Sequence, residues 1–309
     1  MDLRVSLGPL RLKNPIMTAS GTFGYGLEYS VFGSLETLGA IVVKGLSLEP
    51  RRGNTGQRIT ETPCGMLNAI GLQNVGAKAF VEDKLPLLPW RETPVVANLY
   101  AGSVDEFAEL ASYLADAEGV AALEVNISCP NVRAGGVQFG QQPSAAGEVC
   151  AMVREKAGDK PVIVKLSPNV TDITEVARAA AANGADILSL VNTLQGLAVD
   201  VRTRRPRLGN VFGGLSGPAI KPVALRMVHA VCRAVNLPVI GIGGIVSAED
   251  VLEFILVGAH AVQVGSANFM DPRRSFDLVD EVRNLCTELG LAEWSSFRGG
   301  LRLNAWDSL

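Results

Sequence analysis

Histidine is scarce in this chain, with two copies among 309 residues. His229 lies in an apolar-periodic stretch that predicts a helix, and His260 directly precedes a predicted strand. Both positions favour a structural role. Proton transfer is therefore expected from a cysteine, a lysine, a tyrosine, a serine or a carboxylate.

Cysteine is also sparse, and its spacing excludes several kinds of site. The cysteines number five, which is odd, and no two are closer than 21 positions. The sequence therefore holds no C-x-x-C pair, and we expect neither a disulfide framework, nor a zinc ribbon, nor an iron–sulfur cluster held by this chain alone. Cys150 and Cys232 are predicted to be small core residues, as most free cysteines are.

The chain also lacks an excess of positive charge and long apolar runs. Lys plus Arg number 28 against 31 Asp plus Glu, a formal net charge of −3, which argues against a dedicated nucleic-acid-binding protein. The first residues show no signal-peptide pattern, and no apolar run approaches the roughly 20 residues that span a bilayer. We expect a globular cytoplasmic protein with no membrane partner.

Eight short apolar segments have the β-branched character of buried strands. They are residues 15–20, 40–45, 94–100, 122–128, 161–167, 186–193, 238–244 and 261–267. The helical patterns between them include residues 103–118, 171–184, 218–235 and 247–258. Eight alternating units favour closure of a parallel sheet, so the sequence predicts an α/β fold, a (β/α)8 TIM barrel, as one domain over residues 1–309.

Polar residues or glycines end these predicted strands. They are Ser20, Lys44, Asn98, Asn126, Lys165, Asn192, Gly243 with Gly244, and Gly265 with Ser266. In a barrel these ends converge on the face that carries the active site. Three connections, 46–73, 129–143 and 194–217, are long enough to be functional loops on that face.

The residue types at these ends indicate an anionic, ring-containing ligand. Glycines after the last two strands can let backbone N–H groups approach a phosphate. Lys44 and Lys165 are predicted to face anions, although Schiff-base chemistry, as in barrel aldolases, also needs such lysines. Asparagine side chains suit the alternating edges of a pyrimidine or flavin ring. The asparagines concerned are Asn68, Asn98, Asn126 and Asn192.

A cysteine is the best candidate for the proton-transferring base. Cys129 follows the fourth predicted strand in NISCPN, where a Pro-Asn turn can hold it. A loop cysteine near cationic groups can have a lowered pKa and transfer protons. Cys64, in TPCGM, is the main rival.

Nine segments carry a resemblance when they are taken in order over residues 17–266. They are MTASGTFGYG, VVKGLSLEPRRGN, NAIGLQN, NISCPN, VIVKLSPN, VNT, GGLSGPAIKP, GIGGI and QVGSA. In this order they resemble the class 1 dihydroorotate dehydrogenases, which are flavin-binding barrels of pyrimidine biosynthesis. The loop NVRAGGVQFG resembles the two-subunit, NAD-linked class 1B branch rather than the fumarate-linked class 1A branch.

The resemblance implies one FMN per chain and a set of contacts. Positions that match FMN contacts are Ser20, Lys44, Gly45, Asn98, Asn126, Lys165, Val191, Gly217, Gly243, Gly244, Gly265 and Ser266. Positions that match substrate contacts are Lys44, Asn68, Ala69, Ile70, Gly71, Leu72, Asn126, Asn192 and Thr193. In the implied reaction Cys129 takes the C5 proton of (S)-dihydroorotate while hydride leaves C6 for flavin N5, yielding orotate. Lys165 and Lys44 stabilise charge on the reduced flavin and on the substrate carboxylate.

The class 1B resemblance also implies a partner. Electrons would pass from FMN to NAD through an iron–sulfur subunit that carries FAD and a [2Fe–2S] cluster, in an α2β2 heterotetramer built on a homodimer. The arginine-rich segment 201–207 is expected to contact this partner, a second copy of the chain, or solvent alone.

Three other functions stay open from the sequence. The first is a dihydropyrimidine dehydrogenase-type subunit, the second a flavin-free Schiff-base aldolase, and the third a non-enzymatic barrel that binds a partner. The colour of the purified protein separates the flavin-free aldolase from the flavoproteins. Activity on dihydroorotate against dihydrouracil separates the two dehydrogenases.

Overall fold

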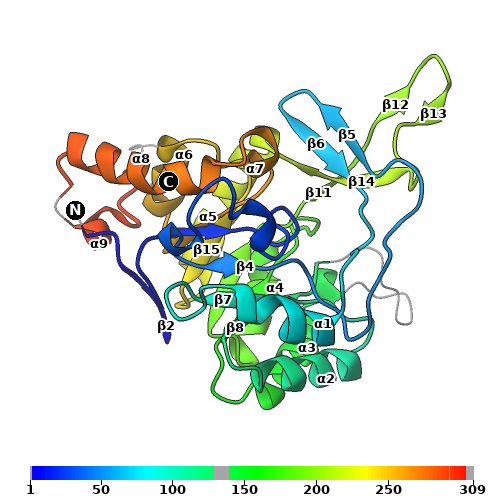
Figure 1. Cartoon of the computed structure of the whole chain (residues 1–309). Helices are drawn as coiled ribbons and strands as arrows, with labels where there is room; N and C mark the ends of the chain where they lie inside the picture. The colour runs from blue at the N-terminus through cyan, green and yellow to red at the C-terminus, as the bar shows by residue number, and fades with distance from the viewer. Residues whose placement is uncertain (1, 129–138, 292, 304–309) are drawn as a thin grey trace.

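The centre of the molecule is an eight-stranded parallel sheet, seen in a computed structural model that describes residues 2–128, 139–291 and 293–303 (Figure 1). The strands, in sheet order, are β3 (Ile16–Thr18), β16 (Ala261–Val264), β15 (Val239–Ile242), β10 (Ile187–Leu190), β9 (Val162–Lys165), β8 (Val120–Asn126), β7 (Val95–Leu99) and β4 (Ile41–Val42). A parallel bridge between Met17 and Ala40 joins the two edges. The predicted (β/α)8 barrel is confirmed.

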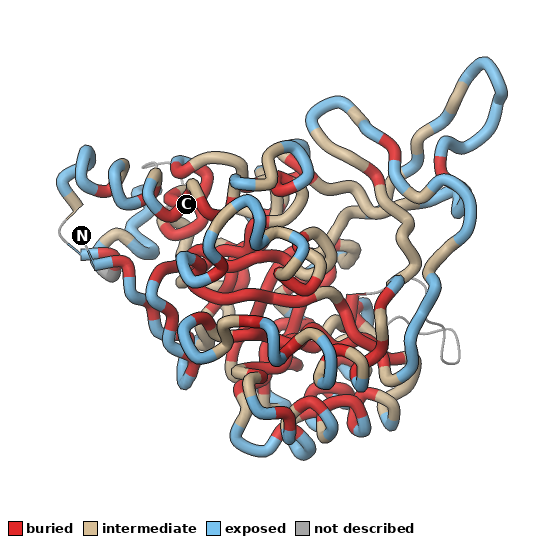
Figure 2. The backbone as a smooth tube through the Cα atoms, in the orientation of Figure 1, coloured by how far each residue is buried: buried red, intermediate tan, exposed pale blue. Residues whose placement is uncertain are grey.

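The strands follow from the apolar segments because a parallel barrel buries both faces of its sheet. β3, β9 and β15 contain no exposed residue, and the buried core occupies the middle of the view in Figure 2. Each predicted range corresponds to one strand. The strands are generally shorter than predicted, because most of the polar residues at their ends belong to the loops and do not pair with the neighbouring strand. β8 differs by starting two residues early, at Val120.

Among the described residues, six helices of nine residues or more follow strands of the sheet and pack around it. They are α2 (Val104–Ala115), α3 (Pro143–Lys156), α4 (Ile173–Ala182), α5 (Lys221–Ala234), α6 (Ala248–Leu256) and α8 (Arg274–Glu288). Side-chain caps set three of the starts: Ser103 accepts from the Glu106 N–H, Asp172 from Thr174, and Ser247 forms a capping box with Asp250. The four named helical ranges each contain a helix, and α3 and α8 are additional.

Shorter pieces complete the described chain. A hairpin of β1 (Val5–Leu7) and β2 (Leu10–Leu12) precedes the barrel. Two short helical turns follow β3, and three contiguous helical pieces over residues 77–87 follow β6. The remaining helical pieces are η1 (Leu27–Tyr29), η2 (Leu35–Thr37), α1 (Ala77–Ala79), η3 (Phe80–Lys84), η4 (Leu85–Leu87), η5 (Phe139–Gln141), η6 (Pro218–Ile220), α7 (Ala267–Met270) and α9 (Trp294–Phe297). Within the described ranges, no helix is long and apolar enough to cross a membrane.

Two of the three long connections contain strands that the sequence did not predict. β5 (Ile59–Thr62), β6 (Gly65–Asn68), β11 (Leu194–Leu197) and β14 (Phe212–Ser216) form a four-stranded antiparallel sheet in the order β11-β14-β6-β5. β12 (Val199–Asp200) and β13 (Arg205–Pro206) extend it as a hairpin. Residues 59–68 and 194–216, here called the projecting sheet, stand away from the barrel at the upper right of Figure 1. Residues 129–138 of the remaining long connection, 129–143, lie outside the described residues.

Candidate active site

The polar strand ends come together at one end of the barrel. In the parallel ladder Asn98 of β7 is the partner of Glu124 on β8, and Asn126 of β8 is the partner of Lys165 on β9. Asn192, just after β10, donates its Nδ2 to Asn126 Oδ1 at 3.2 Å. The predicted convergence of these ends is therefore observed.

A buried carboxylate that the sequence analysis did not single out lies at the centre of this group. Glu124 is completely buried. It accepts hydrogen bonds from Asn98 Nδ2 at 2.6 Å, Ser189 Oγ at 2.9 Å and Gln263 Nε2 at 2.6 Å. Lys165 Nζ lies 3.8 Å from Glu124 Oε2. Five strands thus contribute to one polar cluster inside the barrel.

This cluster explains how Lys165 can be buried at a strand end. Its residue is 5% exposed, and a buried ammonium is costly unless an opposite charge offsets its desolvation. Glu124 supplies that charge, so the anion facing Lys165 is a carboxylate of the protein. Ser128 Oγ also donates to the Lys165 carbonyl oxygen at 2.8 Å, which ties the start of the next loop to β9.

Lys44 has a different environment at the same end of the barrel. It is partly exposed, and among the described residues no ion pair or hydrogen bond involves its ammonium group. Burial and the nearby positive charge of Arg58 lower the pKa of Lys44. A Cβ placed on Gly21 would lie 3.7 Å from Lys44 Nζ, so this glycine leaves space beside the cation. An uncompensated cation with open space beside it suits an anionic ligand.

The predicted substrate segment, residues 68–72, lies where the projecting sheet joins the barrel. Asn68 Nδ2 donates to the Gly214 carbonyl at 3.2 Å across the β6–β14 pair. A Cβ on Gly214 would lie 2.1 Å from Thr193 Oγ1, so Asn68 and Thr193 both pack around this glycine. Gly71 and Leu72 have φ values of 76° and 59°, which turn the chain sharply after Asn68.

Predicted glycines follow β14, β15 and β16, and those after β14 and β15 pack closely together. Gly243, Gly244 and Gly217 have φ values of 133°, 73° and 102°. A Cβ on Gly244 would lie 2.9 Å from the Gly217 carbonyl oxygen, so a larger residue would displace backbone. Gly265 is followed by Ser266, the N-cap residue of the short helix α7 (Ala267–Met270). These strand ends expose backbone where a phosphate commonly binds in barrels.

The other predicted contacts lie beside the same groups. A Cβ on Gly45 would lie 3.0 Å from Asn98 Oδ1, so glycine at this position leaves that oxygen uncovered. Val191 is buried, and its N–H donates to the Ile242 carbonyl at 2.9 Å. Ser20 is half-buried and is the second residue after β3. All of these residues lie at or just beyond the carboxyl ends of the barrel strands.

Comparison with known proteins identifies the family. The family profile described as dihydroorotate dehydrogenase matches residues 2–285. The chain belongs to the dihydroorotate dehydrogenase family.

Proteins named "Dihydroorotate dehydrogenase B (NAD(+)), catalytic subunit" are similar to it over nearly its whole length. The one from Solidesulfovibrio magneticus is 65% identical over 303 residues, which cover 98% of this chain and 99% of that protein. Those from Maridesulfovibrio salexigens and Geotalea uraniireducens are 58% and 56% identical over 98% and 97% of this chain, and over 99% and 98% of those proteins.

The cysteines of this dihydroorotate dehydrogenase family member differ in environment. Cys129 lies outside the described residues. Cys64, its rival, is exposed at the turn between β5 and β6, with a φ of 58°. Burial raises the pKa of Cys150 and of Cys232 to about 12. Cys150 is completely buried, as predicted, whereas Cys232 is only partly buried.

The histidines occupy structural positions, as the sequence indicated. Burial lowers the pKa of His260 to about 4, and its Nδ1 accepts from the Val239 N–H at 3.3 Å, at the start of β15. His229 lies in α5. Within the part of the chain that the structure describes, no group of three or more His, Cys, Asp or Glu residues could hold a metal ion.

Proposed function

We propose that this chain is the catalytic subunit of an NAD-linked dihydroorotate dehydrogenase, which oxidises (S)-dihydroorotate to orotate in pyrimidine biosynthesis. Its family and the names of its relatives support this reaction. The structural observation that carries the proposal is the contrast between two lysines at one barrel end. Lys165 already has a carboxylate partner, whereas Lys44 has none among the described residues and suits the carboxylate of the substrate.

The residues present fit FMN as the cofactor, one per chain. Asn98 Oδ1 and Gln263 Oε1 are buried acceptors with no hydrogen-bond partner among the described residues, and a ring N–H could satisfy such an acceptor. The glycine group of Gly217, Gly243 and Gly244, with Gly265 and Ser266 nearby, fits a phosphate. Bound FMN supplies the acceptor for a hydride. Lys165 would stabilise the negative charge that develops on the ring during reduction.

The chain's own residues would then bind the substrate and move its proton. Lys44 would pair with the carboxylate, and Asn126 and Asn192, already joined by a hydrogen bond, would orient the pyrimidine ring. Cys129 would take the C5 proton while the C6 hydrogen leaves with its electron pair, so that a C5=C6 double bond forms. The role of Cys129 rests on its place in NISCPN, directly after the described residues Asn126–Ser128.

A second polypeptide would complete the electron path to NAD. We propose an iron–sulfur subunit with FAD and a [2Fe–2S] cluster, in an α2β2 heterotetramer with a homodimer of this chain at its core. The absence of a C-x-x-C pair from the sequence supports placing the cluster on another chain. The words "catalytic subunit" in the relatives' names also support it.

Flavin analysis and substrate assays test the proposal. We expect acid treatment of the purified protein to release one FMN per chain, and dihydroorotate, but not dihydrouracil, to bleach the bound flavin. NADH should form only when the iron–sulfur subunit is added. A folded protein that binds no FMN would show that the assignment of FMN as cofactor is wrong. A preference for dihydrouracil would favour the dihydropyrimidine dehydrogenase alternative. Robust NADH formation by the chain alone would overturn the two-subunit assignment.

A further inference from the structure

The negative charge of Glu124 determines how the neutral amide side chains around it are oriented. An ionised carboxylate only accepts hydrogen bonds. Asn98 and Gln263 must therefore turn their amide nitrogens toward Glu124, as the 2.6 Å distances to both nitrogens indicate. Their oxygens then face away from the carboxylate.

Those two oxygens, Asn98 Oδ1 and Gln263 Oε1, are among the buried polar atoms that have no hydrogen-bond partner in the described residues. Burying an amide oxygen without a hydrogen bond is costly. A neutral residue at position 124 could donate as well as accept, so either amide could then turn over. The charge on Glu124 therefore selects the orientation in which Asn98 presents an acceptor rather than a donor.

Lys165 is held by the same carboxylate, but more loosely. Its Nζ lies 3.8 Å from Glu124 Oε2, beyond hydrogen-bond distance, while the three neutral donors lie at 2.6–2.9 Å. Glu124 thus offsets the charge of Lys165 and leaves the donors of the ammonium group available for another group.

We propose that Glu124 is a positioning residue of the cofactor site, an inference that rests on the proposed function. It fixes Asn98 with its carbonyl oxygen toward the cofactor. Through its charge beside Lys165 it also keeps the reduction potential of bound FMN lower than the lysine alone would set it. The residue touches neither substrate nor cofactor in this role, and it acts through Asn98 and Lys165.

The decisive experiment is the reduction potential of FMN bound to the full-length Glu124→Gln variant. The substitution keeps the volume and removes one negative charge, so the site becomes more positive and favours the reduced, more negative flavin. We expect the reduction equilibrium to shift about tenfold toward the reduced form, which is about 30 mV for a two-electron couple. Anaerobic titration against a reference dye, followed by flavin absorbance, measures this shift. If the reduction equilibrium constant of the variant lies within twofold of the wild-type value, the electrostatic role of Glu124 is wrong.

Asp186→Asn is the matched control, because it removes a carboxylate beside a cation elsewhere in the fold. Asp186 precedes β10 at the other end of the barrel, where it accepts from Arg154 and the Val162 N–H. The reduction equilibrium constant of FMN in Asp186→Asn should stay within about twofold of the wild-type value. An equal shift in both variants would mean that overall charge, not the position of Glu124, sets the potential.

Glu124→Asp tests the positioning role separately and serves if the glutamine variant fails to fold. Aspartate keeps the charge but withdraws the carboxylate by one methylene, beyond hydrogen-bond reach of Asn98. FMN should bind at least about fivefold more weakly, measured by quenching of flavin fluorescence. Unchanged FMN affinity would overturn the positioning of Asn98. A wild-type protein that binds no FMN would overturn the proposed function itself, whereas normal wild-type binding with unaltered variants overturns only the role of Glu124.

Discussion

The barrel end buries polar residues, whereas the projecting sheet exposes apolar ones. At the barrel end Asn98 and Glu124 are 0% exposed and Lys165 is 5% exposed, and each has defined partners. In the projecting sheet Val201 is 83% exposed and Phe212 53%. Figure 2 shows a buried centre and an outlying region in which most residues are intermediate or exposed.

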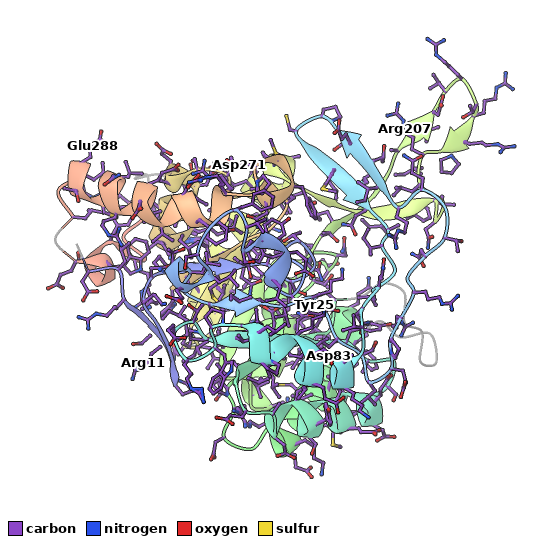
Figure 3. All side chains as sticks on the ribbon, in the orientation of Figure 1. Arg11, Tyr25, Asp83, Arg207, Asp271 and Glu288 are labelled. Atoms are coloured by element: carbon purple, nitrogen blue, oxygen red, sulfur yellow. The ribbon has the colours of Figure 1, made fainter. Side chains whose placement is uncertain are left out.

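The contrast separates two kinds of task. Buried, mutually oriented polar groups are suited to one small ligand, because they need no reorganisation when it binds. Exposed apolar residues and arginines suit contact with a macromolecule. Arg207 lies in the outlying region of Figure 3, and an open cavity of about 670 Å³ beside it is lined by Thr60, Asp200 and Arg205 among others. Substitutions in the two regions should therefore have different effects.

The largest difference is expected between two cysteines. Cys129→Ala should leave FMN bound but slow its reduction by dihydroorotate about 10²- to 10⁴-fold, the usual range for loss of a general base. Cys64→Ala, in the projecting sheet, should reduce flavin at nearly the normal rate. Stopped-flow bleaching of the flavin absorbance measures both. An inactive Cys64→Ala beside a normal Cys129→Ala would transfer the role of base to Cys64.

The second comparison is between a cation at the barrel end and one in the projecting sheet. Lys44→Met should weaken orotate binding about 10- to 100-fold, since a hydrogen bond to a charged group contributes about 1.5–3 kcal/mol. Arg202→Met, an exposed cation in the projecting sheet, should change the dissociation constant less than twofold. Calorimetric titration with orotate checks both. Equal losses would mean that general positive charge, not Lys44, binds the ligand.

A pH series sharpens the role of Lys44 further. Burial and the charge of Arg58 lower the pKa of Lys44 from 10.5, and a bound carboxylate would raise it again. Orotate affinity should be constant while free Lys44 is protonated. Above that lowered pKa it should fall about tenfold per pH unit until the pKa of the complex is reached. Arg58→Gln should move the fall to higher pH. Any decrease of orotate affinity with pH that remains in Lys44→Met is due to other groups. If the decrease is identical in Lys44→Met and the wild type, Lys44 is not its cause.

The sequence predicted the strands and the convergence of their polar ends for a common physical reason. Barrel strands are buried on both faces and read as continuous apolar runs, and the residue that ends each run faces the active end. Lys165 and Asn126 could be placed by that rule without knowledge of their partners. The helices with polar caps, such as the one that begins after Ser103, were equally local signals.

Glu124 and the projecting sheet depend on contacts that no local pattern contains. A single acidic residue in the apolar segment ALEVNIS was the only sign of Glu124, because Asn98, Ser189 and Gln263 reach it from 26 to 139 positions away. The pair of β6 and β14 joins Asn68 to Gly214, 146 positions apart. Both strands are short and only partly buried, so neither resembled a core strand.

The smallest expected effect concerns the exposed arginines of the projecting sheet. Arg205→Glu with Arg207→Glu should leave FMN content and dye reduction unchanged, because both residues are exposed in the projecting sheet and not part of the buried cluster. If this hairpin meets the iron–sulfur subunit, NADH formation at limiting partner should fall about two- to fivefold, because solvent-exposed ion pairs contribute at most about 1 kcal/mol. The loss should grow smaller at high salt, which screens the charges that guide association.

Arg178→Glu on α4, also exposed, is the control for charge alone and should not alter NADH formation. Sedimentation of the double variant separates the other possibility: a shift to monomer would place these arginines between two copies of the chain. Unchanged NADH formation and unchanged mass together would show that they face only solvent.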